Sequence, residues 1–156
     1  MYPGHLSLIV GLMFMNDLAR LEQATAEFFR RHWHEETLSI QRPDWKNWDK
    51  FLNGSVPNYD LGGCYSLFSG LDLLYIGLGA SKGGGIYTDH GLSRRLMAHV
   101  IASDQRRGRE WSKLREAWNS VTSIQTIGFP NEFSYLAAAL ETFLIRELNP
   151  PRNSRV

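Results

Sequence analysis

One carboxylate, that of Glu141, lies in an otherwise apolar C-terminal segment and requires a cation as a partner. The first three turns of the expected helix in residues 133–148 carry a single charge, Glu141. Its neighbours at helical spacing are apolar: Ala137, Ala138, Leu144 and Ile145. Removing an unpaired carboxylate from water costs several kcal/mol. We therefore expect a cation beside Glu141, either a metal ion or an arginine in a structural ion pair.

Arg95 and His99 form a second chemical pair. They are four residues apart in a segment with helical spacing, so they share one helix face flanked by Leu92 and Leu96. The planar, permanently charged guanidinium of arginine suits recognition of a phosphate. Ordinary alternatives are an arginine stem covering apolar surface and a packed histidine.

Two tyrosines lie ten residues apart around a turn. Residues 64–68 and 73–76 have the pattern of two strands, and Ser69-Gly70-Leu71-Asp72 is typical of the turn between them. Antiparallel pairing would bring Tyr65 and Tyr75 close together on one face. Aromatic residues also favour strands for structural reasons alone.

Elements before this hairpin are expected to be helical. Residues 6–36 have helical spacing, and Pro43 is expected to begin a short second helix. Pro57-Asn58 marks a turn. We therefore predict an N-terminal helical extension in residues 1–58, followed by a second domain in residues 59–156.

After the hairpin, the pattern predicts a loop, two helices, a strand and a last helix. The loop covers residues 77–91 and contains six glycines, and the helices cover 92–103 and 109–118. Residues 121–127 are rich in β-branched side chains, as a third strand would be. Asn131 is expected to cap the last helix, which should stop at Pro150-Pro151. The predicted fold is α+β, with a small antiparallel three-stranded sheet flanked by helices.

Composition limits the class of protein. The chain has 156 residues, of which 43% are hydrophobic and 21% charged, as in soluble globular proteins. The single cysteine, Cys64, can form neither an internal disulfide nor a four-cysteine zinc site. It favours a reducing, cytoplasmic setting. The apolar run 6–15 is too short to span a membrane, so no membrane association is expected.

Basic residues are concentrated in one stretch. Residues 94–115 contain seven of them against two acidic residues, whereas the whole chain has a net charge of +1. They are Arg94, Arg95, Arg106, Arg107, Arg109, Lys113 and Arg115. Such a stretch suits a polyanion, and DNA is the expected partner. A solvated helix face is the alternative.

Together these segments resemble the GIY-YIG nuclease family. Gly63-Cys64-Tyr65 followed by Tyr75-Ile76-Gly77 resembles the two-part signature of that family. Residues 92–96 are similar to the segment with its catalytic arginine, 139–141 to that with its metal-binding glutamate, and 148–153 to its asparagine motif. Gly85-Ile86-Tyr87 spells the first motif literally, but it follows the second motif and lies in the glycine-rich loop.

The resemblance implies roles for six residues. Glu141 would hold Mg²⁺, with Mn²⁺ as a substitute, and Arg95 would contact the scissile phosphate. Tyr65 would deprotonate or orient the attacking water, with Tyr75 supporting the water and phosphate and His99 sharing the proton transfer. Asn153 would position the chain end and the active-site groups, unless it is simply a turn residue. Outside the active site, Arg94, Arg106, Arg107, Arg109 and Lys113 are expected to bind DNA.

The expected function is therefore metal-dependent hydrolysis of DNA by an endonuclease, of restriction or mobile-element type. Alternatives are a structure-directed repair nuclease and a catalytically inactive binding module on the same scaffold. A homodimer is a further expectation, since cutting both strands with one site per chain favours two copies. Two features depart from the family pattern: Leu78, where relatives often carry a polar or basic residue, and the long loop 77–91.

Overall fold

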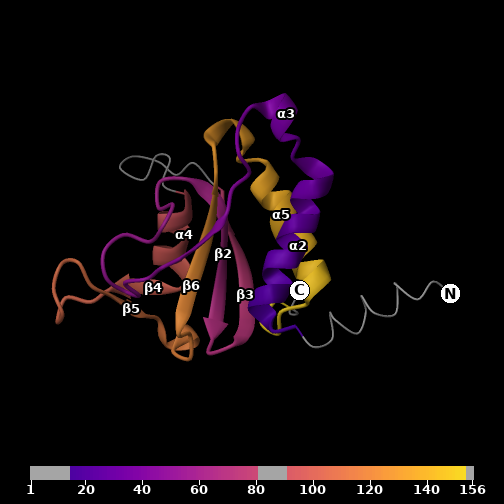
Figure 1. Ribbon diagram of the computed structural model, residues 1–156. Helices are drawn as coiled ribbons and strands as arrows, with labels where there is room; N and C mark the ends of the chain where they lie inside the picture. Colours follow the sequence, from indigo (N-terminus) through magenta and orange to yellow (C-terminus); the bar gives the residue numbers. More distant parts are fainter. Residues whose placement is uncertain (1–14, 81–90, 154–156) are drawn as a thin grey trace.

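A four-stranded antiparallel sheet forms the centre of the computed structural model, which describes residues 15–80 and 91–153 (Figure 1). The strands are β1 (Trp45–Asn47), β2 (Gly62–Ser69), β3 (Asp72–Gly79) and β6 (Ser123–Phe129), in the order β1-β6-β2-β3. The expected hairpin 64–68 and 73–76 is confirmed as β2 and β3, and the expected strand 121–127 as β6. The α+β class is also confirmed.

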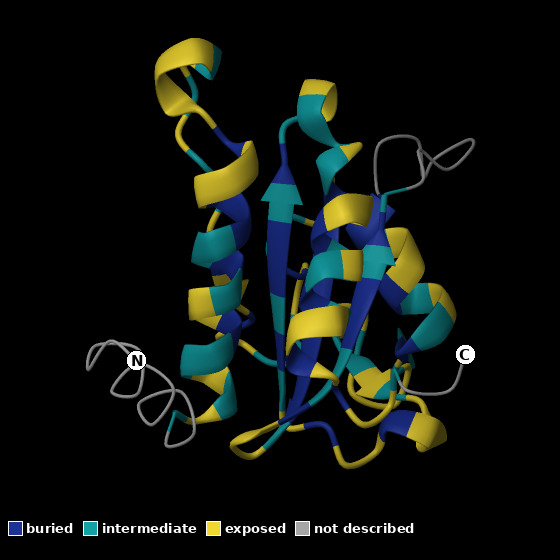
Figure 2. Cartoon of the chain, turned by 90° about the vertical axis from the view of Figure 1, so that its right-hand side faces the viewer, coloured by how far each residue is buried: buried dark blue, intermediate teal, exposed yellow. Residues whose placement is uncertain are grey.

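Helices cover both faces of this sheet. α2 (Asp17–His32) and α5 (Leu136–Leu148) pack together on one face, and α4 (Gly91–His99) lies on the other (Figure 1). A short helix, α3 (Glu35–Leu38), follows α2. The strands are largely buried, whereas the helices expose their outer sides (Figure 2). No helix within residues 15–80 and 91–153 is long and apolar enough to cross a membrane.

The sheet has four strands where three were expected, because the helix predicted from Pro43 does not form. The backbone of Trp45–Asn47 instead pairs with Ile127–Gln125 of β6 as the edge strand β1. Burial of Trp45 fixes this position, since its indole Nε1 donates to Thr25 Oγ1 on α2 at 2.8 Å. A segment this short cannot sustain an isolated helix, so tertiary pairing decides its conformation. The N-terminal region thus supplies a strand to the sheet as well as helices.

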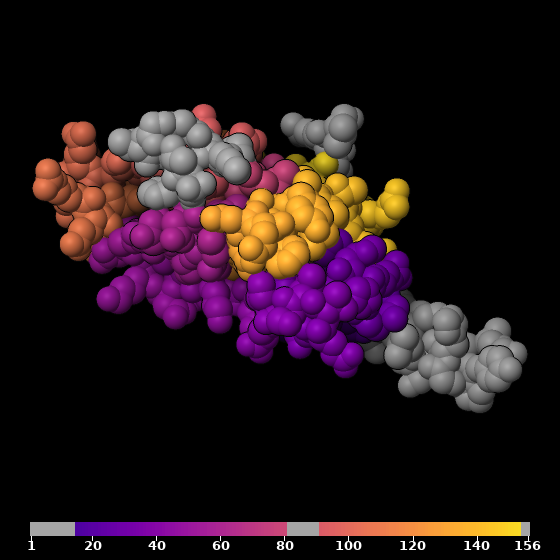
Figure 3. Space-filling view, turned by 90° about the horizontal axis from the view of Figure 1, so that it is seen from above, coloured from indigo at the N-terminus to yellow at the C-terminus, as the bar shows by residue number. Residues whose placement is uncertain are grey.

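The predicted helix 109–118 is also wrong. Ser112–Leu114 form strand β5, which pairs with β4 (Ile101–Ser103), and Glu116–Trp118 form the 3-10 turn η2. The helix expected over 92–103 accordingly ends at His99. Long-range strand pairing here outweighs a local preference for helix. The resulting β4–β5 hairpin extends from the body of the molecule (Figures 1 and 3).

Asn131 does not cap the last helix. It begins the 3-10 turn η3 (Asn131–Phe133), and α5 starts at Leu136 after Tyr135. The helix ends at Leu148, with Asn149 in the left-handed conformation at φ 47°. The first part of the helix predicted from residue 6, and the tripeptide Gly85-Ile86-Tyr87, lie outside the described residues.

Candidate active site

Tyr65 is placed by a close approach to Gly77. Tyr65 pairs with Gly77 across β2 and β3, and its ring lies against that glycine. A Cβ on residue 77 would stand 2.1 Å from Tyr65 Cζ, so no other residue fits there without displacing the ring. The side chain of Tyr65 is fully buried. The glycine of the Tyr75-Ile76-Gly77 motif therefore has a definite structural task, which is to make room for this tyrosine.

Two aromatic side chains, those of Tyr75 and His99, lie beside Tyr65. Its hydroxyl lies 3.1 Å from His99 Nδ1 at the end of α4. The ring centroid of Tyr75 is 6.0 Å from that of Tyr65 and 5.9 Å from that of His99. The predicted proximity of the two tyrosines is confirmed, although Tyr75 pairs with Leu67 rather than with Tyr65.

Burial shapes the acid–base properties of this group. Burial, followed by the neighbouring Tyr75, raises the pKa of Tyr65 far above its usual range, and Arg95 offsets only part of this. Burial also lowers the pKa of His99, assisted by the positive charges of Arg95, Arg115 and Arg152. At neutral pH both partners of the Tyr65–His99 contact are therefore uncharged.

Arg95 connects the aromatic group to Glu141. The Arg95 side chain is exposed, and its guanidinium interacts with the Tyr65 hydroxyl. Burial raises the pKa values of Glu141 and Tyr75, and the charge of Arg95 offsets part of that rise in both. Arg94, the preceding residue, is exposed but perturbs none of the described titratable groups that show a pKa shift. The structure thus distinguishes the two adjacent arginines.

Glu141 reaches the same group from α5. Burial raises the pKa of its carboxyl, and the opposing charge of Arg95 does not cancel that effect. The carboxylate also raises the pKa values of Tyr65 and Tyr75, so it is close enough to both to act electrostatically. Among the described residues, ion pairs within 4 Å occur only on α2, and none includes Glu141. Of the two partners expected for Glu141, the arginine is near but forms no close ion pair.

We call the group formed by these five residues the polar cluster. Its members are Tyr65, Tyr75, Arg95, His99 and Glu141. They come from β2, β3, α4 and α5, and the first and last of them, Tyr65 and Glu141, are nearly half the chain apart in the sequence. No set of three histidine, cysteine, aspartate or glutamate side chains in the described part of the chain could hold a metal ion. Any metal here would depend on Glu141 as the carboxylate ligand.

Asn153 forms two hydrogen bonds with the edge strand β3, and we call this pair of bonds the Asn153 clasp. Its side-chain Oδ1 accepts from Ile76 N at 2.8 Å, and its Nδ2 donates to Ile76 O at 2.9 Å. The side-chain amide therefore pairs with β3 as another strand would. Because Ile76 lies between Tyr75 and Gly77, the clasp holds the strand that carries the motif. The positioning role in catalysis expected for Asn153 stays a prediction, which these two hydrogen bonds to β3 support.

A pocket adjoins the polar cluster at the chain end. It has a volume of about 520 Å³, and we call it the tail pocket. Tyr75, His99, Trp118, Pro151 and Arg152 line it. The Arg152 guanidinium stacks on Trp118 at 3.8 Å and donates to Ala117 O at 2.7 Å. No signal in the sequence indicates a pocket at its last three residues, because Trp118 is predicted on a helix, and residues 150–152 serve only as a helix stop and as part of the asparagine motif.

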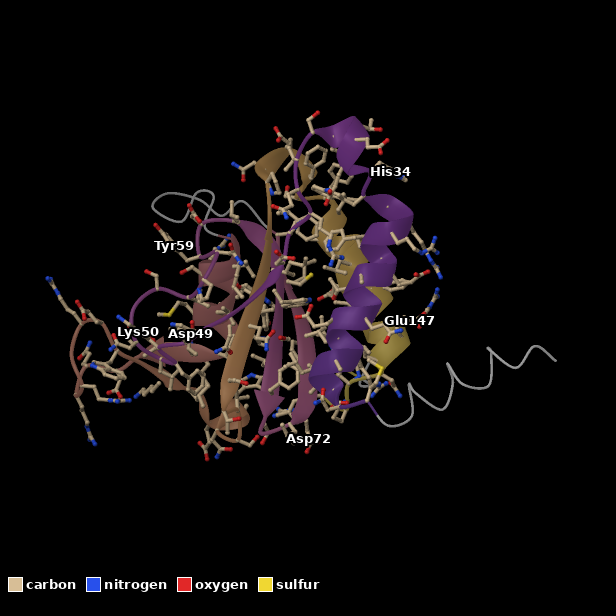
Figure 4. All side chains as sticks on the ribbon, in the orientation of Figure 1. His34, Asp49, Lys50, Tyr59, Asp72 and Glu147 are labelled. Atoms are coloured by element: carbon tan, nitrogen blue, oxygen red, sulfur yellow. The ribbon has the colours of Figure 1, made fainter. Side chains whose placement is uncertain are left out.

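Most of the residues expected to bind DNA lie on the β4–β5 hairpin. Arg106, Arg107, Arg109 and Lys113 are exposed there, and Arg107 stacks on Trp111 at 3.5 Å. Nitrogen-tipped side chains extend from this hairpin into solvent (Figure 4). Arg115 differs, since it donates to Met97 O at 2.6 Å and to Ile101 O at 3.1 Å and so ties the hairpin to α4.

Comparison of the chain with protein-family models, with curated proteins and with solved structures gives no match.

Proposed function

We propose that this protein is a metal-dependent DNA endonuclease of the GIY-YIG type. The observation that carries the proposal is the convergence of the polar cluster. Two tyrosines, an arginine, a histidine and a glutamate from four separate elements lie together, and burial with the charge of Arg95 acts on the pKa values of Tyr65, Tyr75, His99 and Glu141. Perturbed titratable groups of this kind gather at functional sites. They also supply the groups that hydrolysis of a phosphodiester requires.

Arg95 is suited to the scissile phosphate. Its side chain is exposed, so a substrate can reach it, yet its charge acts on the buried Tyr65 and on Glu141. A fixed guanidinium can stabilise the negative charge that develops on the phosphoryl oxygens. Arg95 would therefore bind the phosphate on the side of the cluster where the water is activated.

The contact between Tyr65 and His99 suggests how the proton moves. A free phenolate at Tyr65 is disfavoured, because burial raises its pKa. We infer that the Tyr65 oxygen accepts a proton from water while its own proton passes to His99 Nδ1. The resulting hydroxide forms the new P–O bond as the bond to the leaving oxygen breaks. His99 suits this part because it is neutral at pH 7. Tyr75 would support the water by hydrogen bonding.

Glu141 fits a ligand for Mg²⁺ or Mn²⁺. Its carboxyl is half-buried and its pKa is raised, so a divalent cation would offset the cost of its charge. Mg²⁺ is commonly held by one or two carboxylates together with water and substrate phosphate, and a larger cluster is unnecessary. Such an ion supplies stabilisation of the leaving oxygen when bound. The role of Glu141 itself is to hold that ion beside Arg95.

The β4–β5 hairpin and Arg94 would provide the DNA contacts. Exposed guanidinium and ammonium groups on a projecting hairpin suit the phosphate backbone. Arg106, Arg107, Arg109 and Lys113 lie on it. A homodimer would allow both strands to be cut.

A cleavage assay tests the proposal. Wild type, Glu141→Ala and the control Glu147→Ala, which alters an exposed carboxylate on the same helix (Figure 4), are incubated with unmethylated plasmid in Mg²⁺, Mn²⁺ or EDTA. We expect cleavage by wild type and Glu147→Ala only, and its loss in EDTA. Discrete fragments would indicate sequence-specific cutting, and cleavage of branched DNA alone a structure-directed nuclease. Intact plasmid, branched and single-stranded DNA would favour an inactive binding module instead.

A further inference from the structure

The tail pocket brings a second arginine to the edge of the polar cluster. Tyr75 and His99 belong to both, so the two are continuous. Arg152 lines the pocket together with His99, and its charge adds to burial, Arg95 and Arg115 in lowering the pKa of that histidine. No carboxylate of the described residues lines the pocket. Of the residues that line it, Arg152 carries the positive charge, and a guanidinium suits an anion.

Arg152 is held in place by its surroundings. Its guanidinium stacks on Trp118 at 3.8 Å, and one of its nitrogens donates to Ala117 O at 2.7 Å. Its backbone N–H donates to Leu74 O at 3.0 Å, and the Asn153 clasp follows directly. Fixing a guanidinium in advance reduces the entropy lost when it binds a ligand. Since guanidinium has five N–H donors, the bond to Ala117 leaves capacity for an oxyanion.

Trp118 supports the arginine and is unsuited to stacking on a base. It is only 5% exposed, with Arg152, Tyr75 and His99 against its ring. Its indole Nε1 donates to His99 O at 3.1 Å. A ligand in the pocket would thus meet the guanidinium rather than an open aromatic face. The chemistry favours a phosphate over a nucleobase.

We propose that Arg152, supported by Trp118, binds a second phosphate of the DNA strand, next to the one that Arg95 contacts. This inference rests on the proposed nuclease function and extends it, because it assigns the tail pocket to the substrate backbone. The site recognises a phosphodiester in any sequence, so it contributes affinity and register without base specificity. Arg115 is not among the residues that line the pocket, and its guanidinium instead donates to Met97 O and Ile101 O.

Duplex binding tests the assignment without relying on cleavage. Variants are made in the Glu141→Ala background, and affinity for a random-sequence duplex is measured by fluorescence anisotropy over a salt series. Arg152→Ala should reduce the slope of log affinity against log salt by about one. Arg30→Ala, which removes the same charge from an exposed position on α2, should leave the slope unchanged. Arg152→Lys should keep most of the slope, because it retains the charge. Thermal unfolding midpoints establish that the variants are folded.

Position along the strand is tested with duplexes that carry one neutral methylphosphonate each. One such position should weaken binding in the Arg30→Ala protein and have no effect in Arg152→Ala. In Arg95→Ala, a methylphosphonate at a different position of the strand should have no effect on the affinity. Equal salt slopes for Arg152→Ala and Arg30→Ala would overturn the phosphate site. A reduction of the slope that is as large in Arg152→Lys as in Arg152→Ala would also overturn it. The nuclease proposal would be untouched, since it is judged by cleavage. Failure of the Glu141→Ala protein to bind duplex at all would also overturn the site.

Discussion

The two faces of the sheet use the same strands for different purposes. Toward α2 and α5, the packing is dominated by aromatic and aliphatic side chains, among them Phe28, Phe29, Trp33 and Phe129. Toward α4, the buried set includes Tyr65 and Trp118, and next to it lie the polar groups of the cluster. The alternation of a strand accounts for this, because Cys64 packs on one side and Tyr65 on the other.

This difference shows how the molecule can keep polar groups in unfavourable surroundings. The apolar face supplies the burial that stabilises the fold, so the opposite face can hold Tyr65 and His99 with perturbed pKa values beside the charge of Arg95. Glu141 is the one member of the polar cluster that does not belong to the α4 face of the sheet. It comes from the helix of the apolar face and still acts on the tyrosines. Substitutions on the two faces should therefore separate stability from chemistry.

The largest effect is expected on the polar face. Arg95→Ala should lower the cleavage rate by roughly 10³-fold or more, on the scale of arginines that stabilise phosphoryl transfer. Arg94→Ala, its exposed neighbour on α4, should have a small effect on the rate constant. Single-turnover kinetics with saturating protein measures both. Similar rate losses in the two variants would contradict a distinct role for Arg95.

On the apolar face, Phe29→Ala should reduce the free energy of unfolding by about 3–5 kcal/mol, because it leaves a cavity among buried rings. Leu18→Ala, at a 43% exposed position on the same helix, should cost far less. Urea denaturation gives both values. The folded fraction of Phe29→Ala should cleave at the wild-type rate, and a specific loss of turnover would show that the faces are not separable.

Substitution of Gly77 should affect both the stability of the fold and the position of Tyr65 in the polar cluster. Gly77→Ala forces a methyl group into the ring of Tyr65, so it should cost about 1–3 kcal/mol of stability and displace the tyrosine. In Gly62→Ala, on the partner strand, the new Cβ meets other atoms only at ordinary distances of 3.4 Å and more. Thermal unfolding and cleavage rates of the two variants make the comparison. Normal activity of Gly77→Ala would argue against the present position of Tyr65.

The pH dependence of cleavage should follow His99. Because its pKa is lowered from the usual value of 6.5, the neutral form that accepts the proton prevails at neutral pH. The rate should stay level near pH 7 and decline only in more acidic solution, as His99 becomes protonated. His99→Ala should reduce the rate and remove this step from the profile. A profile unchanged in His99→Ala would exclude the histidine from the proton transfer.

The smallest effect concerns stability at Glu141. Burial raises its folded pKa above 4.5, so the unfolded chain loses this proton first and stability falls as pH rises from about 4.5 through the folded pKa. Without metal at pH 7, Glu141→Gln should therefore be slightly more stable than wild type. Adding Mg²⁺ should raise the thermal midpoint of wild type but not of Glu141→Gln. Equal responses of both proteins to Mg²⁺ would contradict metal binding at Glu141.

By itself, the sequence determined the elements with strong local signals. The hairpin followed from its turn residues and strand pattern, the α5 segment from helical spacing, and the carboxylate needing a partner from its apolar neighbours. The motif residues were likewise picked out by type and spacing, since chemistry of this kind requires definite side chains.

Only the tertiary structure decided what depends on distant partners. Trp45–Asn47 becomes a strand because β6 offers an edge and Thr25 accepts a bond from the buried indole, and Ser112–Leu114 becomes one because β4 lies beside it. In the tail pocket, Arg152 lies against Trp118, and the next residue, Asn153, pairs with Ile76 of β3. These outcomes depend on contacts between residues far apart in the chain, whereas local propensity depends only on neighbouring residues.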